Sequence, residues 1–140
     1  MPQHMAREQR EQYLSEVRIG VLSVGRPGRE PLTVPIWYDF RAGAVVFTSA
    51  EGSKKNDLLR AAGRASLCVH NDSWPYSYVT VEGPVTLRER SAQDIEDMAI
   101  RYLGPQAGAE YARDVTWGGV LAELTPERWL TVDYSGDGEA

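Results

Sequence analysis

Hydrophobic and polar residues alternate along much of this 140-residue chain, with the period of two that is typical of β-strands. The clearest alternation covers residues 32–40, where the apolar positions are Leu32, Val34, Ile36, Tyr38 and Phe40. This pattern predicts one continuous strand. Pro35 lies within it and has no N–H to donate to a neighbouring strand, so we expect a sheet edge, a bulge or the close approach of another group there.

Strand-forming segments bounded by turn residues predict further strands over residues 18–24, 44–49, 65–71, 76–87, 120–124 and 129–134. Most neighbouring strands are separated by short turns, and strands do not alternate regularly with helices, which favours an antiparallel sheet over a parallel one. This number of strands in a chain of this length favours closure into a small barrel. We therefore expect a mainly β fold with peripheral helices, in a single domain over residues 1–140.

Helical patterns occur at residues 6–16, 53–62, 91–103 and 106–113. The first is rich in Glu, Gln and Arg and has few apolar residues, so we expect a short helix exposed to solvent. Ser53 is a favourable N-cap residue, and Gly63 suits the left-handed conformation that ends a helix. Residues 135–140 form a small polar tail.

Charge and composition narrow the classes of partner. The formal net charge is −5, and the arginines are scattered among more numerous carboxylates, so nucleic-acid binding is not expected. Cys68 is the only cysteine and there are two histidines, which predicts no disulfide within the chain and no metal site. No apolar run approaches the roughly 20 residues of a membrane span, and the N-terminus is too polar for a signal peptide. We expect a cytoplasmic protein.

Only two of the 15 basic residues are lysines, and they are adjacent: Lys54 and Lys55. They follow the loop at Gly52, at the start of a predicted helix, where free backbone amides and the helix dipole favour an anion. Cations in a first helical turn oppose that dipole, and a bound phosphate would offset the repulsion. The alternative, which the spacing supports equally, is that both lysines lie in solvent and pair with Glu51 or Asp57.

Two other groups of residues suggest chemistry. Cys68 and His70 would share one side of a strand, but about 7 Å apart, beyond hydrogen-bond reach, so we expect Cys68 to be a small core residue. Aromatic residues also gather on positions that the core does not use, namely Trp37, Trp74, Tyr76, Tyr78 and Trp117. Such a set indicates a ligand wall or a subunit interface, and the alternative is a second apolar layer under the helices.

Five motifs in order along the chain resemble the pyridoxamine 5′-phosphate oxidase-like split-barrel proteins. They are residues 35–38 (Pro-Ile-Trp-Tyr), 46–49 (Val-Phe-Thr-Ser), 53–60 (Ser-Lys-Lys-Asn-Asp-Leu-Leu-Arg), 64–69 (Arg-Ala-Ser-Leu-Cys-Val) and 78–85 (Tyr-Val-Thr-Val-Glu-Gly-Pro-Val). The resemblance extends over about residues 17–134 in motif order. Within the family, the chain is most similar to the actinobacterial branch that uses the deazaflavin coenzyme F420.

The resemblance implies a six-stranded antiparallel split β-barrel, paired as a homodimer with cofactor sites at the interface. It places the phosphate-binding lysine at Lys55. By the same resemblance, the remaining cofactor contacts are Ser53, Lys54, Thr48, Ser49, Pro35, Ile36 and Trp37, with Trp74, Tyr76 and Trp117 as a wall from the same subunit or from the partner. Family members often carry arginine where Lys54 stands and asparagine where Leu58 stands.

The function implied is an oxidoreductase that transfers hydride between coenzyme F420 and a small unsaturated organic substrate, with FMN as the alternative cofactor. A proton would come from Tyr38, Tyr76 or solvent. The chain has no strong signature of a pyridoxal-substrate site. Three alternatives remain: an FMN-dependent enzyme resembling pyridoxamine-phosphate oxidase, a non-catalytic flavin-, F420- or haem-binding protein, and a barrel used only for protein contacts.

Overall fold

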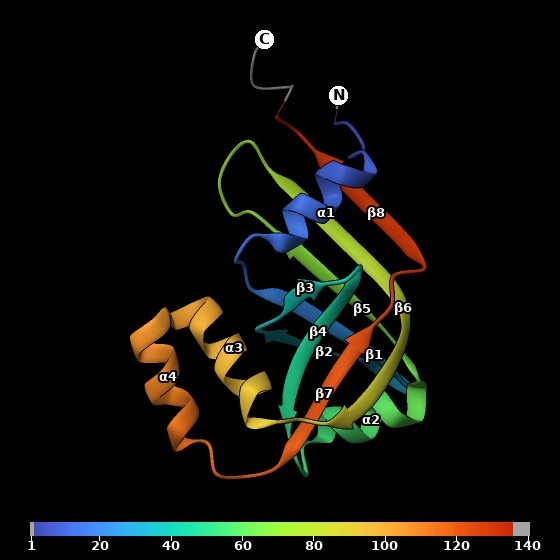
Figure 1. Cartoon of the computed structure of the whole chain (residues 1–140). Helices are drawn as coiled ribbons and strands as arrows, with labels where there is room; N and C mark the ends of the chain where they lie inside the picture. The colour runs from blue at the N-terminus through green and yellow to red at the C-terminus, as the bar shows by residue number, and fades with distance from the viewer. Residues whose placement is uncertain (1, 136–140) are drawn as a thin grey trace.

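A computed structural model describes residues 2–135, and in this part of the chain it contains four helices and eight strands (Figure 1). The helices are α1 (Arg7–Ser15), α2 (Lys54–Ala62), α3 (Ala92–Leu103) and α4 (Pro105–Asp114). The strands are β1 (Gly20–Arg26), β2 (Arg29–Ile36), β3 (Asp39–Arg41), β4 (Ala44–Ala50), β5 (Arg64–His70), β6 (Ser77–Glu89), β7 (Gly119–Leu124) and β8 (Arg128–Asp133).

The long strand β6 belongs to two sheets, and this sharing makes the fold a split β-barrel. Its first part pairs with β5 and β8, and its last part pairs with β7. The strand order is β2-β1-β5-β6-β8 on one side and β6-β7-β4-β3 on the other, with every pair antiparallel. The expected mainly β, antiparallel split barrel with peripheral helices is confirmed.

The core lies between the two sheets. Leu22, Leu67 and Val81 are directly paired across β1, β5 and β6, and all three are fully buried. Phe47 of β4 and Leu124 of β7 close the core from the other sheet, also without exposed surface. Burial of each such side chain stabilises the fold by about 1.5–3 kcal/mol. The alternating pattern of the sequence therefore selects the correct inward-facing residues.

The prediction of one strand over residues 32–40 is wrong, because the chain changes sheets within it. β2 ends at Ile36 and pairs with β1, whereas β3 begins at Asp39 and pairs with β4. Ile36 and Tyr38 are both buried, so the alternation continues through the break. A period of two reports which side chains face inward and not which strand is the hydrogen-bonding neighbour. This break helps to bring the strand count to eight, where six were expected from the family resemblance.

Helix α1 is less exposed than the sequence predicts. Leu14 is fully buried, and the Tyr13 hydroxyl lies 2.9 Å from the Ser77 hydroxyl and donates to the Ser77 carbonyl at 3.0 Å. One turn with two apolar residues is enough to attach a polar helix to a barrel. Of the predicted polar tail, residues 136–140 lie outside the described residues.

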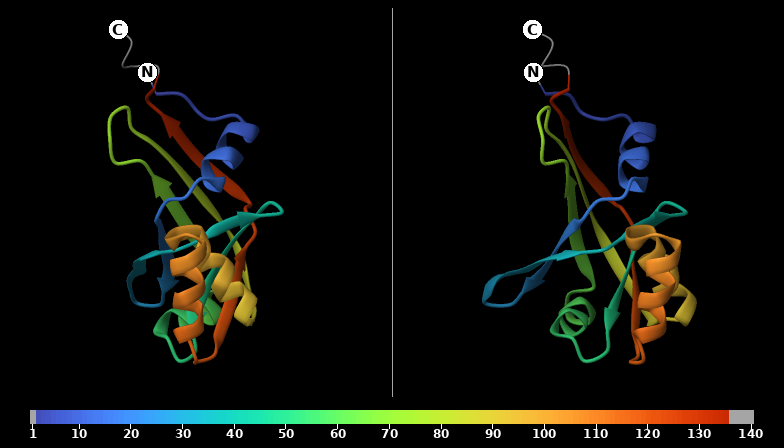
Figure 2. Two further views of the ribbon diagram at one scale, coloured as in Figure 1. Left: turned by 60° about the vertical axis from the view of Figure 1, so that its left-hand side comes forward. Right: turned by 90° about the vertical axis from the view of Figure 1, so that its left-hand side faces the viewer.

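The remaining helices surround the lower half of the barrel. In Figure 1, α2 lies at the bottom and the α3–α4 pair lies to one side. The β1–β2 hairpin projects away from the body of the barrel in the right-hand view of Figure 2. No helix in residues 2–135 is both long enough and apolar enough to cross a bilayer.

Candidate functional site

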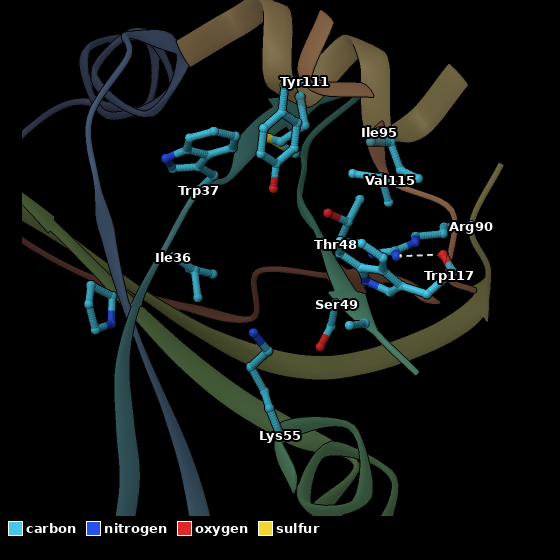
Figure 3. A pocket seen from close by; sticks show the side chains of 13 residues that line it. Ile36, Trp37, Thr48, Ser49, Lys55, Arg90, Ile95, Tyr111, Val115 and Trp117 are labelled. Carbon is cyan, nitrogen blue, oxygen red and sulfur yellow. Dashed lines mark hydrogen bonds between the residues drawn. The ribbon is translucent and has the colours of Figure 1, made fainter. Parts of the chain in front are cut away.

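A pocket of about 270 Å³ lies where the end of β2, the end of β4, the start of α2 and the α3–α4 pair meet (Figure 3). The structure brings together seven residues that the sequence singled out: Pro35, Ile36, Trp37, Thr48, Ser49, Lys55 and Trp117. Sequence reasoning missed the other lining residues, which are Ala50, Arg90, Ile95, Met98, Tyr111 and Val115. About half of the residues that line the pocket were therefore predicted from the sequence, and the others were not.

Lys55 enters the pocket from the first turn of α2. Its side chain extends toward the space between Ile36 and Ser49 (Figure 3). The side chain is half-buried, and because burial penalises the charged form, the pKa of the Lys55 ammonium is lowered. An anion placed beside it would restore the charged form, so this lysine is suited to bind one.

The side chain of Ser53 caps the N-terminus of α2. The Ser53 hydroxyl accepts the Asn56 N–H at 3.2 Å as the helix cap, and Gly63 ends the helix in the left-handed conformation, which confirms both predictions. Ser53 does not line the pocket, and its cap orients the first turn that carries Lys55. Lys54 is exposed and is also absent from the pocket lining. The structure thus distinguishes two lysines that their spacing alone left equivalent.

Arg90 is a second cation of the pocket, and no sequence motif pointed to it. Its guanidinium donates to the backbone carbonyl of Trp117 at 3.0 Å (Figure 3) and to that of Gly118 at 3.2 Å. It lies against Gly119, where an added Cβ would stand 2.6 Å from the guanidinium carbon. Within the described lining, Lys55 and Arg90 are the charged residues and no carboxylate is present, although the chain carries a net charge of −5.

The opposite wall of the pocket is apolar and aromatic. Trp37 packs against Tyr102, at 5.0 Å between ring centroids, and against Tyr111, at 5.6 Å. Tyr111 and Trp117 are about half-exposed at the mouth. Ile95 belongs to α3 and lines the pocket. The spacing of apolar residues predicted this helix, but it could not show that part of the apolar side of the helix faces a cavity and not the core.

Three aromatic residues proposed for the site lie elsewhere in the same subunit. Trp74 and Tyr76 pack on each other at 5.5 Å near the start of β6, and they are 56% and 49% exposed. Neither lines the pocket of its own chain. Tyr38 is fully buried, and its hydroxyl is directed to the Glu16 carbonyl, 3.5 Å away; burial raises the pKa of this hydroxyl. It does not reach the pocket as a proton donor.

Cys68 is not the core residue that the sequence predicts. Its neighbours Leu67 and Val69 are fully buried, and because side chains alternate along a strand, Cys68 points to the outer face of β5. His70 is exposed on the same strand. Neither residue lines the pocket, so the Cys–His pair has no place in the site.

Comparisons with solved structures show the same fold. The conserved hypothetical protein Rv2991 from Mycobacterium tuberculosis superposes with a TM-score of 0.82 at 19% identity, over 97% of this chain and 89% of that one. An F420 reductase matches with a TM-score of 0.68 at 20% identity, over 86% and 94%. HutZ, the haem storage protein from Vibrio cholerae, matches with a TM-score of 0.68 at 13% identity, over 90% and 94%.

Sequence comparison places the chain in a family. Among proteins with curated descriptions, none matches the chain. The family model described as pyridoxamine 5′-phosphate oxidase matches residues 6–129, which include strands β1 to β7 and every element that lines the pocket. The chain belongs to the pyridoxamine 5′-phosphate oxidase family, as the motifs predicted.

Proposed function

We propose that the pocket binds the phosphate and ring of a deazaflavin or flavin, with coenzyme F420 preferred to FMN, and that the protein is an oxidoreductase acting on a small unsaturated organic substrate. The observation that carries the proposal is the half-buried Lys55 ammonium at the N-terminus of α2, inside a pocket whose other wall is aromatic. A phosphate suits the first part and a planar ring suits the second.

The residues present fit such a group. Lys55, the Thr48 and Ser49 hydroxyls and the amides of the first turn of α2 would hold the phosphate. Ile36 and Trp37 would contact the ring. Arg90 adds a second fixed cation, which supports F420, whose tail is acidic. The F420 reductase among the solved structures supports the same choice.

The bound cofactor supplies the hydride chemistry, and the chain supplies binding, orientation and the exclusion of water. The apolar residues Ile95 and Met98 line the pocket and reduce its contact with solvent. Tyr111 directs its hydroxyl toward the cavity (Figure 3), so it replaces Tyr38 in our proposal for a proton donor, beside solvent and the partner's copy of Tyr76.

We also propose a homodimer that completes the site. The pocket of about 270 Å³ is small for a tricyclic cofactor, because ligand pockets usually hold about 300–1,000 Å³. A row of side chains crosses the outer face of the larger sheet: Pro35, Val21, Cys68, Thr80 and Leu130 are successive partners in register. Leu130 is 52% exposed, and Pro35 also lines the pocket. A second copy seated on this face would lie next to the cofactor.

A parallel titration with F420 and FMN tests the proposed function. We expect F420 to bind more tightly than FMN, and the reduced cofactor to be reoxidised by at least one member of a panel of unsaturated substrates. Tighter binding of FMN would reverse the choice of cofactor. Binding without turnover on any substrate would favour a storage or carrier protein, and binding of haem alone would favour the role named for HutZ.

A further inference from the structure

We propose that Tyr102 is a positioning residue, which fixes the Trp37 indole as the flat wall against which the cofactor ring lies. The inference rests on the proposed function for its ligand. The arrangement of the Tyr102 and Trp37 side chains can be tested in the protein without a cofactor.

Trp37 lies at a break in the strand pairing of the barrel. It lies between β2 and β3, where the chain leaves one sheet for the other, and Tyr38 next to it belongs to neither strand. Backbone groups in such a break lack ladder partners, and buried groups without partners are costly. The strands therefore do not determine by themselves how the indole is oriented.

Tyr102 supplies the missing partners from α3, 64 positions further along the chain. Its hydroxyl oxygen accepts the Tyr38 N–H at 3.0 Å and lies 2.6 Å from the Arg18 carbonyl and 2.9 Å from the Tyr38 carbonyl, to one of which it donates. Arg101 adds a bond from its Nε to the Tyr38 carbonyl at 2.8 Å. Two adjacent residues of one helix thus complete the backbone hydrogen bonds of Tyr38.

The same tyrosine holds the indole. The Tyr102 and Trp37 rings stack with centroids 5.0 Å apart and planes only 5° from parallel. Tyr102 does not line the pocket, whereas Trp37 does, so the phenol ring lies behind the indole and covers one of its faces. The stack therefore holds the indole from the side of α3, and the indole lines the cavity together with Tyr111, 5.6 Å away between ring centroids.

Helix α3 is itself firmly attached at this end, which makes the support rigid. Arg101 donates to the Ser15 and Glu16 carbonyls, each at 3.0 Å, and forms an ion pair with Asp39 at 3.1 Å. The helix is therefore connected to the C-terminal end of α1 and to β3, the strand that follows the break. A wall that is fixed before binding reduces the entropy lost when a planar ring settles on it.

The first test uses the protein without cofactor, labelled with 5-fluorotryptophan. Fluorine NMR gives one resonance for each tryptophan, and Trp37→Phe identifies that of Trp37. We expect Tyr102→Leu to move this resonance, because the ring current of the stacked phenol is lost, and Tyr102→Phe to move it much less. An unchanged Trp37 resonance in Tyr102→Leu would overturn the proposal.

The second test separates ring binding from phosphate binding by using FMN and riboflavin, which lacks the phosphate. If only F420 binds, the same comparison uses F420 and its phosphate-free deazaflavin nucleoside in place of FMN and riboflavin. Tyr102→Leu should weaken both members of a pair equally, by about threefold to tenfold, as expected for a misplaced stacking partner. Lys55→Ala should instead weaken only the phosphorylated member. Equal loss of affinity in Tyr102→Phe and Tyr102→Leu would show that the stack is not responsible, and would overturn the proposal.

Phe40→Leu is the matched control for general loss of stability. It removes the Phe40–Trp129 aromatic pair, 6.4 Å between centroids, which lies outside the pocket. It should move the Trp129 resonance and leave both affinities as in the unmodified protein; a loss of affinity equal to that of Tyr102→Leu would overturn the proposal. If the unmodified protein binds none of the four ligands, the proposed function fails, and the Trp37 resonance alone decides whether Tyr102 positions the indole.

Discussion

The hydroxyl of Ser49, near the end of β4, lies 3.0 Å from the hydroxyl of Ser53, the N-cap of α2. This contact joins a buried strand residue to the helix start across a glycine-containing loop, in which Gly52 adopts a positive φ of 78°. It fixes where the first turn of α2 begins. The direction in which Lys55 leaves that turn is fixed as a result.

Lys55→Ala should weaken binding of a phosphate-bearing cofactor by about 1.5–3 kcal/mol, the loss expected for a charge-assisted hydrogen bond in a partly buried site. Lys54→Ala is the matched control, because it removes the same charge from the neighbouring position, which is exposed and outside the pocket. Isothermal titration gives both dissociation constants. Equal effects of the two substitutions would mean that only long-range charge matters.

The affinity for the cofactor should fall at high pH because Lys55 loses its proton. Burial lowers the pKa of this ammonium below its ordinary value of about 10.4, so the fall begins earlier than for an exposed lysine. Lys55→Arg keeps its charge throughout the range and should abolish this component. Titration of the ligand itself affects both proteins equally, so it cancels when the pH profile of Lys55→Arg is compared with that of the unmodified protein. Parallel profiles would contradict the assignment of Lys55 to the phosphate.

Asp94→Asn should destabilise the protein by about 1–2 kcal/mol at neutral pH, the usual cost of losing a capping interaction with a charge-assisted partner. The Asp94 carboxylate accepts from Arg88 at 2.9 and 3.2 Å and from the Ser91 N–H at 2.8 Å, and these bonds hold its pKa below the ordinary value. Its ionised form is therefore favoured in the folded state over the unfolded one.

The sign of the pH dependence follows from that lowered pKa. The stabilisation by Asp94 is complete above the unfolded-state pKa of about 3.9 and is lost as the pH falls through the folded-state value. Urea denaturation at pH 7 and at progressively lower pH should show the difference between the protein and Asp94→Asn shrinking below about pH 4. A difference that stays constant would show that the charge contributes nothing.

Gly119→Ala should displace Ser49 and Arg90, two residues that line the pocket. An added Cβ would stand 2.2 Å from the Ser49 carbonyl oxygen and 2.6 Å from the Arg90 guanidinium carbon, so β4 and β7 must separate and Arg90 must move. We expect a loss of about 1–3 kcal/mol in the free energy of unfolding, together with weaker cofactor binding. In the control Gly118→Ala, the nearest atom is a flexible Glu51 side-chain oxygen at 3.0 Å, and the effect should be smaller.

Leu130→Arg should dissociate the proposed homodimer, because it places a charge on the outer face of the larger sheet, at its β8 edge. Light scattering at micromolar concentration should give a dimer for the unmodified protein and a monomer for the variant, with cofactor affinity reduced in the monomer. A monomeric unmodified protein that binds cofactor at full affinity would exclude a shared site.

Local signals in the sequence were sufficient for the strand–loop–helix segment that carries Lys55. The caps at Ser53 and Gly63 and the apolar run that begins β4 act between residues close in the chain, and the structure reproduces them. The inward-facing side of most strands was equally predictable, because alternation depends only on the geometry of an extended chain. The prediction for Cys68 is wrong because Leu67 and Val69 both face inward, and the alternation of a strand then turns Cys68 outward.

The sequence by itself determined the barrel, the inward-facing residues and the helix that presents Lys55, since each depends on periodicity or on a cap. Only the tertiary structure decided that the chain changes sheets at Trp37, that α3 closes this break with Tyr102, and that Arg90 joins Lys55 in one pocket. These relationships join residues far apart in sequence. They depend on which surfaces pack together, and no local pattern records that choice.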